Sequence, residues 1–386
     1  MAVPDVIVVG LGTVGAATCL ALARQGVDVQ GIDAFDPPHT RGSHHGLSRS
    51  IRRAYLEGTV YVPMVLRAWE QWRRLERDTG LELLVTSGNL TIGPADGPAV
   101  SGFLASARAY DIPHTFLTAA EVGRRWPQLV VPPGLVAGLE TEAGILHAER
   151  CIAALLDQAR KAGAVLRVNE RVRRWQVCRH GIRVTTDRGV YETGRLLLAA
   201  GARNPRLLGR PSNPLSTRRV AVHWIDPPPG DDFRHGSLPV NFWQLPPDGG
   251  DAGQGFREFY CLPEFPPGAG VKVAAHNNLA ICDPDRLQPL VTEDERCACA
   301  GFLKTCLPDL VRRPARNAIC FYTQTPDGEF WLGPFPEQPG VLVCALAGHG
   351  FKFAPVLGEI LADLLTDRAP AYDLSRFAIN RFDPER

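Results

Sequence analysis

The sequence predicts an α/β protein of two domains, and three observations carry this prediction. The N-terminal residues read as a strand, a glycine-rich turn, a helix and a second strand, which is the order of a βαβ unit. After about residue 215, several short runs of alternating apolar residues are typical of a half-buried sheet. A length of 386 residues is also too great for one ordinary core, which favours two domains.

The N-terminal βαβ unit is the most specific of these features. We expect strands at Val6–Val9 and Val27–Ile32 and a helix at Ala16–Arg24. Glycines in such a turn let the backbone approach a pyrophosphate, the helix N-terminus favours its charge, and a terminal acid accepts from a ribose hydroxyl. The unit therefore predicts a dinucleotide site, and the acid favours FAD or NAD over NADP. The residues expected at this site are Gly10, Gly12, Gly15 and Asp33.

Further elements follow along the chain. A helix is expected around residues 152–162 and another at 355–365. Strands are expected at 165–168, 182–186, 196–201, 220–224, 256–262 and 271–275. The stretch Asp226–Gly270 is rich in proline and glycine and is expected to consist of loops. The expected nucleotide-binding domain comprises 1–84, 148–214 and 319–386, and the substrate domain 85–147 and 215–318, with substrate bound between them.

Composition argues against several kinds of partner. The 42 basic and 41 acidic residues nearly cancel, so no overall charge favours nucleic acid or an anionic membrane. No apolar run is long enough to span a bilayer, and the N-terminus lacks the basic leader of a signal peptide. The ten cysteines are scattered, and Cys297 and Cys299 have no second ligand pair at a zinc-like spacing. We expect a cytoplasmic monomer without a bound metal.

Two stretches outside the βαβ unit carry charge in unusual places. Residues 36–46 form a loop of glycine, proline and histidine that leads into Arg49 and Arg52, and such a loop lies on the surface or against a ligand. Near the C-terminus, Lys352 stands between two phenylalanines just after a Gly-His-Gly turn. A basic side chain in apolar surroundings is costly unless an anion compensates it. We therefore expect an anionic ligand beside Lys352.

These stretches resemble the monomeric sarcosine oxidase and N-methyltryptophan oxidase family of FAD-dependent amine oxidases. The likeness runs over nearly the whole chain in the family's order and is looser from about Pro205 to Gly270. It implies a Rossmann-like FAD-binding domain assembled from discontinuous segments, plus a sheet-rich substrate domain. The matching segments are Asp33–Gly46, Arg49, Arg52, Ala54, Tyr55, Tyr61–Pro63, Cys320–Asp327, Gly348–Phe353, Val356–Ile360 and Phe377–Arg381.

The resemblance implies a set of cofactor residues. Cys320 matches the cysteine that carries FAD through a thioether to the flavin 8α-methyl group, a link that withdraws electron density from the ring. His45 and Arg49 match basic residues beside the isoalloxazine, which favour negative charge on the flavin. The other cofactor residues that it implies are Ser43, His44, Val172, Gly348, His349 and Lys352.

The resemblance also implies catalytic residues. Arg52 and Lys352 match the pair that holds the substrate carboxylate, the first as a planar fork and the second as a point charge. Lys272 lies in an alternating run and matches the lysine that assists the reaction with O2. His276 is expected on the same face of that strand, and Tyr260 matches an active-site tyrosine.

The activity implied is oxidation of a secondary or N-methyl amino acid to an imine, with O2 reduced to hydrogen peroxide. Sarcosine, N-methyltryptophan and a cyclic imino acid all remain open, and departures at Ser48, Arg53, Trp331 and Ala347 favour a specialised substrate, such as a cyclic amine carboxylate from a biosynthetic pathway. An FAD amine dehydrogenase with another electron acceptor is the main alternative. A NAD-dependent enzyme or a non-catalytic nucleotide-binding module would explain only the N-terminal unit and would leave Cys320 unexplained.

Overall fold

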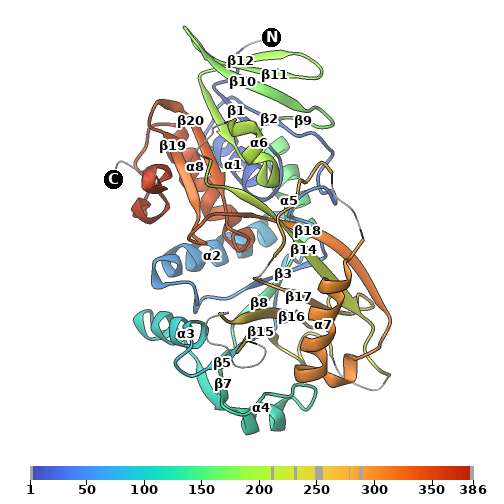
Figure 1. The fold of residues 1–386 in the computed structure, drawn as a ribbon. Helices are drawn as coiled ribbons and strands as arrows, with labels where there is room; N and C mark the ends of the chain where they lie inside the picture. The colour runs from blue at the N-terminus through green and yellow to red at the C-terminus, as the bar shows by residue number, and fades with distance from the viewer. Residues whose placement is uncertain are drawn as a thin grey trace.

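A computed structural model describes residues 3–209, 213–229, 233–247, 255–277, 279–286 and 290–382. It consists of an upper part around a six-stranded sheet and a lower part around an eight-stranded sheet (Figure 1). The chain passes between the two parts several times, so each is built from separated segments. The α/β class expected from the sequence is confirmed.

The six-stranded sheet has the strand order β19-β20-β13-β1-β2-β9 and is parallel except for the β19–β20 pair. Its strands are β1 (Val6–Val9), β2 (Val29–Ile32), β9 (Val165–Arg167), β13 (Arg195–Leu198), β19 (Trp331–Phe335) and β20 (Gln338–Ala345). Helices α1 (Thr13–Arg24), α5 (Ala148–Lys161) and α8 (Ala354–Leu365) pack together on one face. An antiparallel sheet of β10 (Val172–Cys178), β11 (Gly181–Thr186) and β12 (Val190–Thr193) covers the other.

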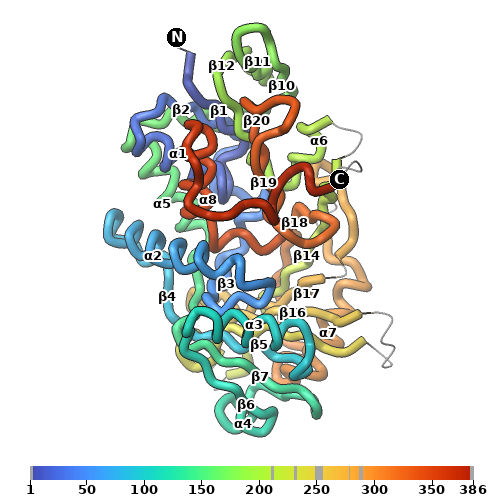
Figure 2. Tube along the Cα trace, turned by 90° about the vertical axis from the view of Figure 1, so that its left-hand side faces the viewer, coloured from blue at the N-terminus to red at the C-terminus, as the bar shows by residue number. Residues whose placement is uncertain are grey.

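The side chains of β1 point alternately to the two faces of this sheet, and both sets are apolar, so both faces must be covered. Val6 and Val8 belong to the core beneath the helices, whereas Ile7 and Val9 belong to the core beneath β10–β12. A parallel strand buried on both faces reads as a continuous apolar run, as β1 does. Figure 2 shows the helices and the β10–β12 sheet on opposite sides of β1 and β2. The carboxyl ends of β1 and β2 are thereby left as the open edge for a ligand.

The eight-stranded sheet has the order β18-β14-β17-β16-β15-β5-β7-β6. Its strands are β5 (Asn89–Pro94), β6 (Thr115–Thr118), β7 (Leu135–Glu140), β14 (Ser216–Ile225), β15 (Val240–Leu245), β16 (Arg257–Leu262), β17 (Val271–Ala275) and β18 (Ala315–Gln324). One face packs on helix α7 (Glu293–Cys306), where Trp243 and Phe259 contact Phe302. Residues at the alternate positions point to the opposite face, toward the upper part of the molecule.

The remaining elements connect these sheets. A third small sheet pairs β3 (Ser48–Ile51), β8 (Gly144–His147) and β4 (Leu84–Thr86). The remaining helices are α2 (Val62–Thr79), α3 (Pro98–Ala109), α4 (Ala119–Arg125) and α6 (Asn204–Leu208). No helix within the described residues is both long and apolar enough to cross a bilayer.

The structure differs from the sequence-based expectations in one loop assignment and at one domain boundary. The stretch Asp226–Gly270 was expected to be loops, and this is wrong for β15, which is buried at every position in the sheet centre. Proline and glycine on either side of this short apolar run concealed it. Residues 230–232 and 248–254 of the same stretch lie outside the described residues. The boundary expected between residues 318 and 319 falls inside β18, which pairs along its whole length with β14.

Candidate active site

One cavity joins the open edge of the six-stranded sheet to the inner face of the eight-stranded sheet. Of the residues expected at the site, it is lined by Gly10, Gly12, Asp33, Ser43, His44, Arg49, Arg52, Val172, Tyr260, Lys272, His276, Cys320, Gly348, His349 and Lys352. Gly15 and His45 are not among its lining residues. Gly15 instead packs within the turn, where an added Cβ would lie 1.7 Å from the Gly10 carbonyl oxygen.

The end of the cavity beside β1 and β2 fits a dinucleotide. Gly10 has φ +94°, and a Cβ there would lie 2.6 Å from the Ala199 carbonyl oxygen, so only glycine is accommodated. Helix α1 follows Gly12, and no described side chain caps its first N–H groups, which leaves them available to an anion. Asp33 accepts hydrogen bonds from the backbone N–H groups of Leu11 at 2.7 Å and Phe35 at 2.9 Å.

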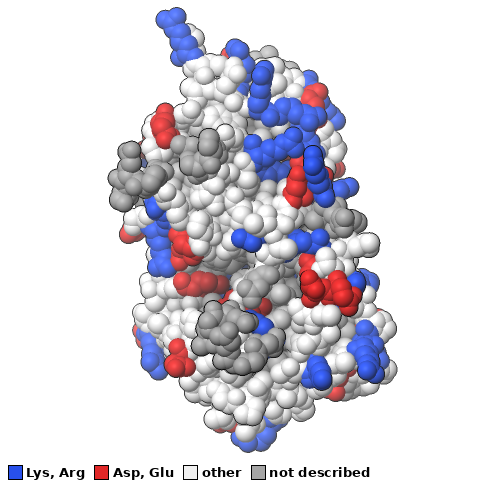
Figure 3. Space-filling view, in the orientation of Figure 1, with Lys and Arg blue, Asp and Glu red and all other residues white. Residues whose placement is uncertain are grey.

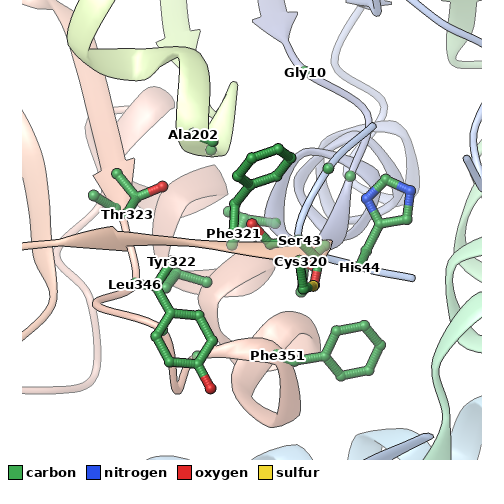
Figure 4. A pocket seen from close by; sticks show the side chains of 18 of the residues that line it. Gly10, Ser43, His44, Ala202, Cys320, Phe321, Tyr322, Thr323, Leu346 and Phe351 are labelled. Carbon is green, nitrogen blue, oxygen red and sulfur yellow. The ribbon is translucent and has the colours of Figure 1, made fainter. Parts of the chain in front are cut away.

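Cys320 lies on β18 beside the 36–46 loop, next to Ser43 and His44 (Figure 4). Arg49 Nη2 lies 3.6 Å from its sulfur, and Ser43 O lies 3.7 Å away. Burial alone would raise the pKa of this thiol, but the neighbouring His45 imidazole and the charges of Arg49 and Lys272 lower it to about 6. Cys320 is therefore a thiolate at neutral pH, and a thiolate is the nucleophilic form of cysteine.

Lys272 is buried between β17 and the same loop. Its Nζ donates to the carbonyl oxygens of Gly46 at 3.0 Å and Ser48 at 2.7 Å, and only 2% of the residue is exposed. Burial and the nearby Arg49 hold the pKa of Lys272 well below its usual range. The amine is thus fixed at the cavity wall, close to Cys320 and Arg49.

Arg52 is paired with Glu57, a cavity residue that no sequence motif indicated. Arg52 Nη2 donates to both Glu57 carboxylate oxygens, at 2.8 and 2.9 Å. Burial would raise the pKa of Glu57, but Arg52 lowers it to about 2, so the pair stays ionised. Arg52 Nε is buried and has no hydrogen-bond partner among the described residues. That N–H can donate to a ligand in the cavity.

Lys352 and Arg52 both lie against the ring of Tyr55. Lys352 Nζ donates to the His349 carbonyl oxygen at 2.7 Å and to Tyr55 Oη at 3.3 Å. Both Lys352 Nζ and Arg52 Cζ lie 5.1 Å from the centroid of the Tyr55 ring. Burial and the charge of Arg52 lower the pKa of Lys352 to about 7, and Glu57 opposes this shift. Two buried cations therefore converge on one part of the cavity.

The turn before Lys352 requires glycine. Gly348 has φ +84°, and a Cβ there would lie 2.3 Å from the ring of Tyr322. The close approach of this turn to β18 brings Lys352 to the same cavity as Cys320. Tyr322 itself lines the cavity, and its alternation with Cys320 along β18 could have identified it in the sequence.

Aromatic side chains cover the substrate end. Phe242 lies 5.7 Å from Arg52 Cζ and 5.5 Å from the His276 ring, measured to ring centroids. His276 Nδ1 and Tyr322 Oη are 3.3 Å apart, and Tyr260 lies opposite Phe242 in the β15–β16 register. Burial lowers the pKa of His276 to about 4, so its imidazole is neutral at neutral pH.

Comparison with known proteins decides the family. A family model described as FAD dependent oxidoreductase, DAO, matches residues 5–364. The chain belongs to the DAO family of FAD-dependent oxidoreductases. This confirms FAD over NAD, which the N-terminal unit alone had left open, and the geometry of the dinucleotide end fits that cofactor.

Relatives of this DAO-family chain include two kinds of oxidase. The monomeric sarcosine oxidase of Streptomyces avermitilis is 37% identical over 386 residues, which cover 99% of this chain and 97% of that protein. The N-methyl-L-tryptophan oxidase of Citrobacter koseri is 34% identical over 381 residues, covering 98% and 99%. The resemblance inferred from the sequence is therefore confirmed.

A solved structure shares the whole fold. The open form of NikD, described as an unusual amino acid oxidase essential for nikkomycin biosynthesis, superposes with a TM-score of 0.82. It is 25% identical and covers 98% of each chain. The L-proline dehydrogenase of P. horikoshii has the same TM-score at 20% identity, which shows the likeness of fold alone.

Proposed function

We propose that this FAD-dependent oxidoreductase oxidises a secondary or N-methyl amino acid to an imine and reduces O2 to hydrogen peroxide. The observation that carries the proposal is the pair of buried cations, Arg52 and Lys352, on the ring of Tyr55 in the cavity that also holds Cys320. A carboxylate is the anion that such a fork and point charge orient together. The oxidase names of the relatives support the same reaction.

Each of these cavity residues has a separate proposed role in the reaction. FAD, held at the dinucleotide end by residues that include Gly10, Gly12 and Asp33, would supply the acceptor for the hydride on the carbon beside the substrate nitrogen and the route of the electrons to O2. Arg52 Nε and the ammonium group of Lys352 would bind the carboxylate and fix the amine carbon in position. His276 is neutral at neutral pH, so it places no further positive charge beside the substrate amine. Phe242 and Tyr322 exclude water from the substrate end.

Cys320 is proposed to carry the flavin covalently. The Cys320 thiol, with a pKa of about 6 beside Arg49 and His45, would as a thiolate add to the flavin 8α carbon after that methyl group has lost a proton; the electron pair would pass into the flavin ring, and O2 would reoxidise the ring. Acid precipitation of the purified protein tests this. Yellow colour should stay in the pellet of the parent protein and pass into the supernatant for Cys320→Ala. Colour released from the parent protein would contradict the link.

Lys272 is proposed to assist the reaction with O2. The first electron transferred to O2 creates a negative charge, and the protonated form of Lys272, held in place by the Gly46 and Ser48 carbonyl oxygens, would lower the barrier to it. Rapid reoxidation in air would support an oxidase, whereas slow reoxidation in air together with fast reduction of an artificial acceptor would favour an amine dehydrogenase.

The substrate is proposed to be a sarcosine-like, N-methyltryptophan-like or cyclic amino acid that lies between Phe242, Tyr260 and His276. Peroxide release from a panel of sarcosine, N-methyltryptophan, proline and pipecolate identifies it. Equal release from each amino acid and its methyl ester would reject the carboxylate site. We also propose that the chain forms two domains, one around each large sheet, and that the substrate binds between them. The protein is proposed to be a cytoplasmic monomer. Its ten cysteines are free, as expected in a reducing compartment.

A further inference from the structure

Asp285 forms ion pairs with three arginines at the dinucleotide end of the cavity. Arg203 Nε lies 2.9 Å and Arg171 Nη1 3.6 Å from its Oδ1, and Arg206 Nη1 lies 3.1 Å from its Oδ2. All four side chains line the cavity, as do Asp33 and Phe35. We call Asp285, Arg171, Arg203 and Arg206 the Asp285 clasp. The site chemistry described above does not use any of them.

The Asp285 clasp joins segments that are distant in the chain. Asp285 follows β17, in the chain that leads to helix α7 of the lower part, whereas Arg171 precedes β10 and Arg203 precedes α6 in the upper part. Figure 3 shows basic side chains gathered on this face over the region that Figure 1 labels α6 and β10. The ion pairs therefore tie a segment after β17 to the elements that form the dinucleotide end.

Arg203 is the central member of the Asp285 clasp. Besides Asp285, its Nη1 donates to the Arg41 carbonyl oxygen at 2.8 Å, which ties in the 36–46 loop. Its guanidinium lies 5.2 Å from the centroid of the Phe35 ring, and that of Arg171 lies 5.5 Å from the same centroid. The Phe35 backbone N–H donates to Asp33, the residue expected at the ribose. Arg203 therefore contacts Phe35, and Phe35 in turn contacts Asp33 at the expected ribose position.

The charges of the Asp285 clasp suit an anionic ligand. Burial would raise the pKa of Asp285, but Arg203, Arg171 and Arg206 lower it, so the carboxylate stays charged at neutral pH. Three guanidinium groups against the carboxylates of Asp285 and Asp33 still leave an excess of positive charge at this end of the cavity. FAD carries a negatively charged diphosphate, so this excess favours its binding.

We propose that the Asp285 clasp closes the dinucleotide end of the cavity over the adenosine half of FAD and slows its escape. The proposal rests on FAD dependence, and it is independent of the thioether proposed at Cys320 and of the substrate. The clasp holds the cofactor at the end opposite Cys320, by ion pairs that must break before the Arg203 segment and the Asp285 segment can separate.

The test is the rate at which FAD leaves a protein that cannot form the thioether. In a Cys320→Ala background, release is followed as the recovery of flavin fluorescence after dilution. Arg203→Met removes the bonds to Asp285 and Arg41 and should speed release about tenfold or more. Asp285→Asn raises the positive charge beside the diphosphate but removes the ion pairs that join the two segments, so a clasp predicts faster release; release slower than that of the parent would show that charge alone acts there and would overturn the proposal. FAD release at the parent rate in both variants would overturn the proposal.

A matched control separates the clasp from general loss of stability. Arg219 and Glu295 form an ion pair about as buried as that of Arg203 and Asp285, with bonds of 2.7 and 3.0 Å, and Arg219 does not line the cavity. Arg219→Met should leave the release rate unchanged, and a rise equal to that of Arg203→Met would also overturn the proposal.

A second measurement uses the protein with Cys320 in place. Phosphodiesterase cleaves the diphosphate of exposed FAD and frees AMP, which is measured by chromatography. Asp285→Asn should free AMP faster than the parent protein, and equal rates would contradict the clasp. Neither readout requires turnover, so failure of the proposed amine oxidation leaves this result standing, and failure of the clasp leaves the oxidation standing.

Discussion

Lys352 should make the binding of a carboxylate dependent on pH near neutrality. Burial and the charge of Arg52 lower its pKa to about 7 in the free cavity. A bound carboxylate favours the ammonium form, so affinity should be fully present below pH 7 and should be lost as the pH rises. His276 and His349, with pKa values of about 4, are neutral throughout this range.

The size of the effect follows from the charged fraction of Lys352. If only the ammonium form binds, the apparent Kd equals the intrinsic Kd divided by that fraction. With a pKa of about 7, half of Lys352 is charged at pH 7 and about one hundredth at pH 9. The apparent Kd should therefore rise about 50-fold between these two values.

The assay is a titration of the holoenzyme with methoxyacetate, an amine-free carboxylate that does not titrate in this range, followed by the change in flavin absorbance. Lys352→Met should bind more weakly at pH 6 and should lose the pH dependence, whereas Lys352→Arg should keep the binding at high pH. A steep rise of Kd in Lys352→Met, or a flat profile in the parent protein, would refute the assignment.

Three further outcomes are expected. Lys272→Met should slow reoxidation by O2 far more than reduction by substrate in stopped-flow traces, and equal slowing of both would remove its role. Glu140→Ala should lower the free energy of unfolding in urea by roughly 3–5 kcal/mol, because the backbone N–H groups of Arg53 and Ala54 lose their acceptor and the Arg53 side chain keeps only its ion pair with the exposed Glu142; a loss below about 1 kcal/mol would contradict this. Gly348→Ala should lower the melting temperature more than Gly26→Ala, since both have positive φ but only Gly348 would meet a ring; equal losses would show that backbone strain alone decides.

Local patterns in the sequence predicted the dinucleotide end of the site well. The β1–α1–β2 unit and its glycines follow from contacts between near neighbours, which the spacing of Gly10 to Gly15 encodes directly. The strand at 271–275 was also found by its alternation, which predicted Lys272 and His276 on one face, and both line the cavity.

Long-range pairing could not be predicted in the same way. Glu57 and Asp285 lie in no motif, and their roles depend on arginines that only the folded chain brings to them. β15 was missed because its neighbours are prolines and glycines, and its burial comes from pairing with β5 and β16. The partners of such residues depend on which distant segments the topology brings together. The resemblance to a family identified only the site residues that lie inside the family's motifs.

The central claim is that one cavity holds FAD beside a site that binds the carboxylate of an amine donor. Anaerobic titration of the purified protein with an N-methyl amino acid and with its methyl ester tests this claim directly. The amino acid should bleach the visible flavin absorbance in the parent protein, while the ester should not, and Arg52→Met should require far more of the amino acid. Equal bleaching by acid and ester, or the absence of flavin absorbance from the purified protein, would contradict the account.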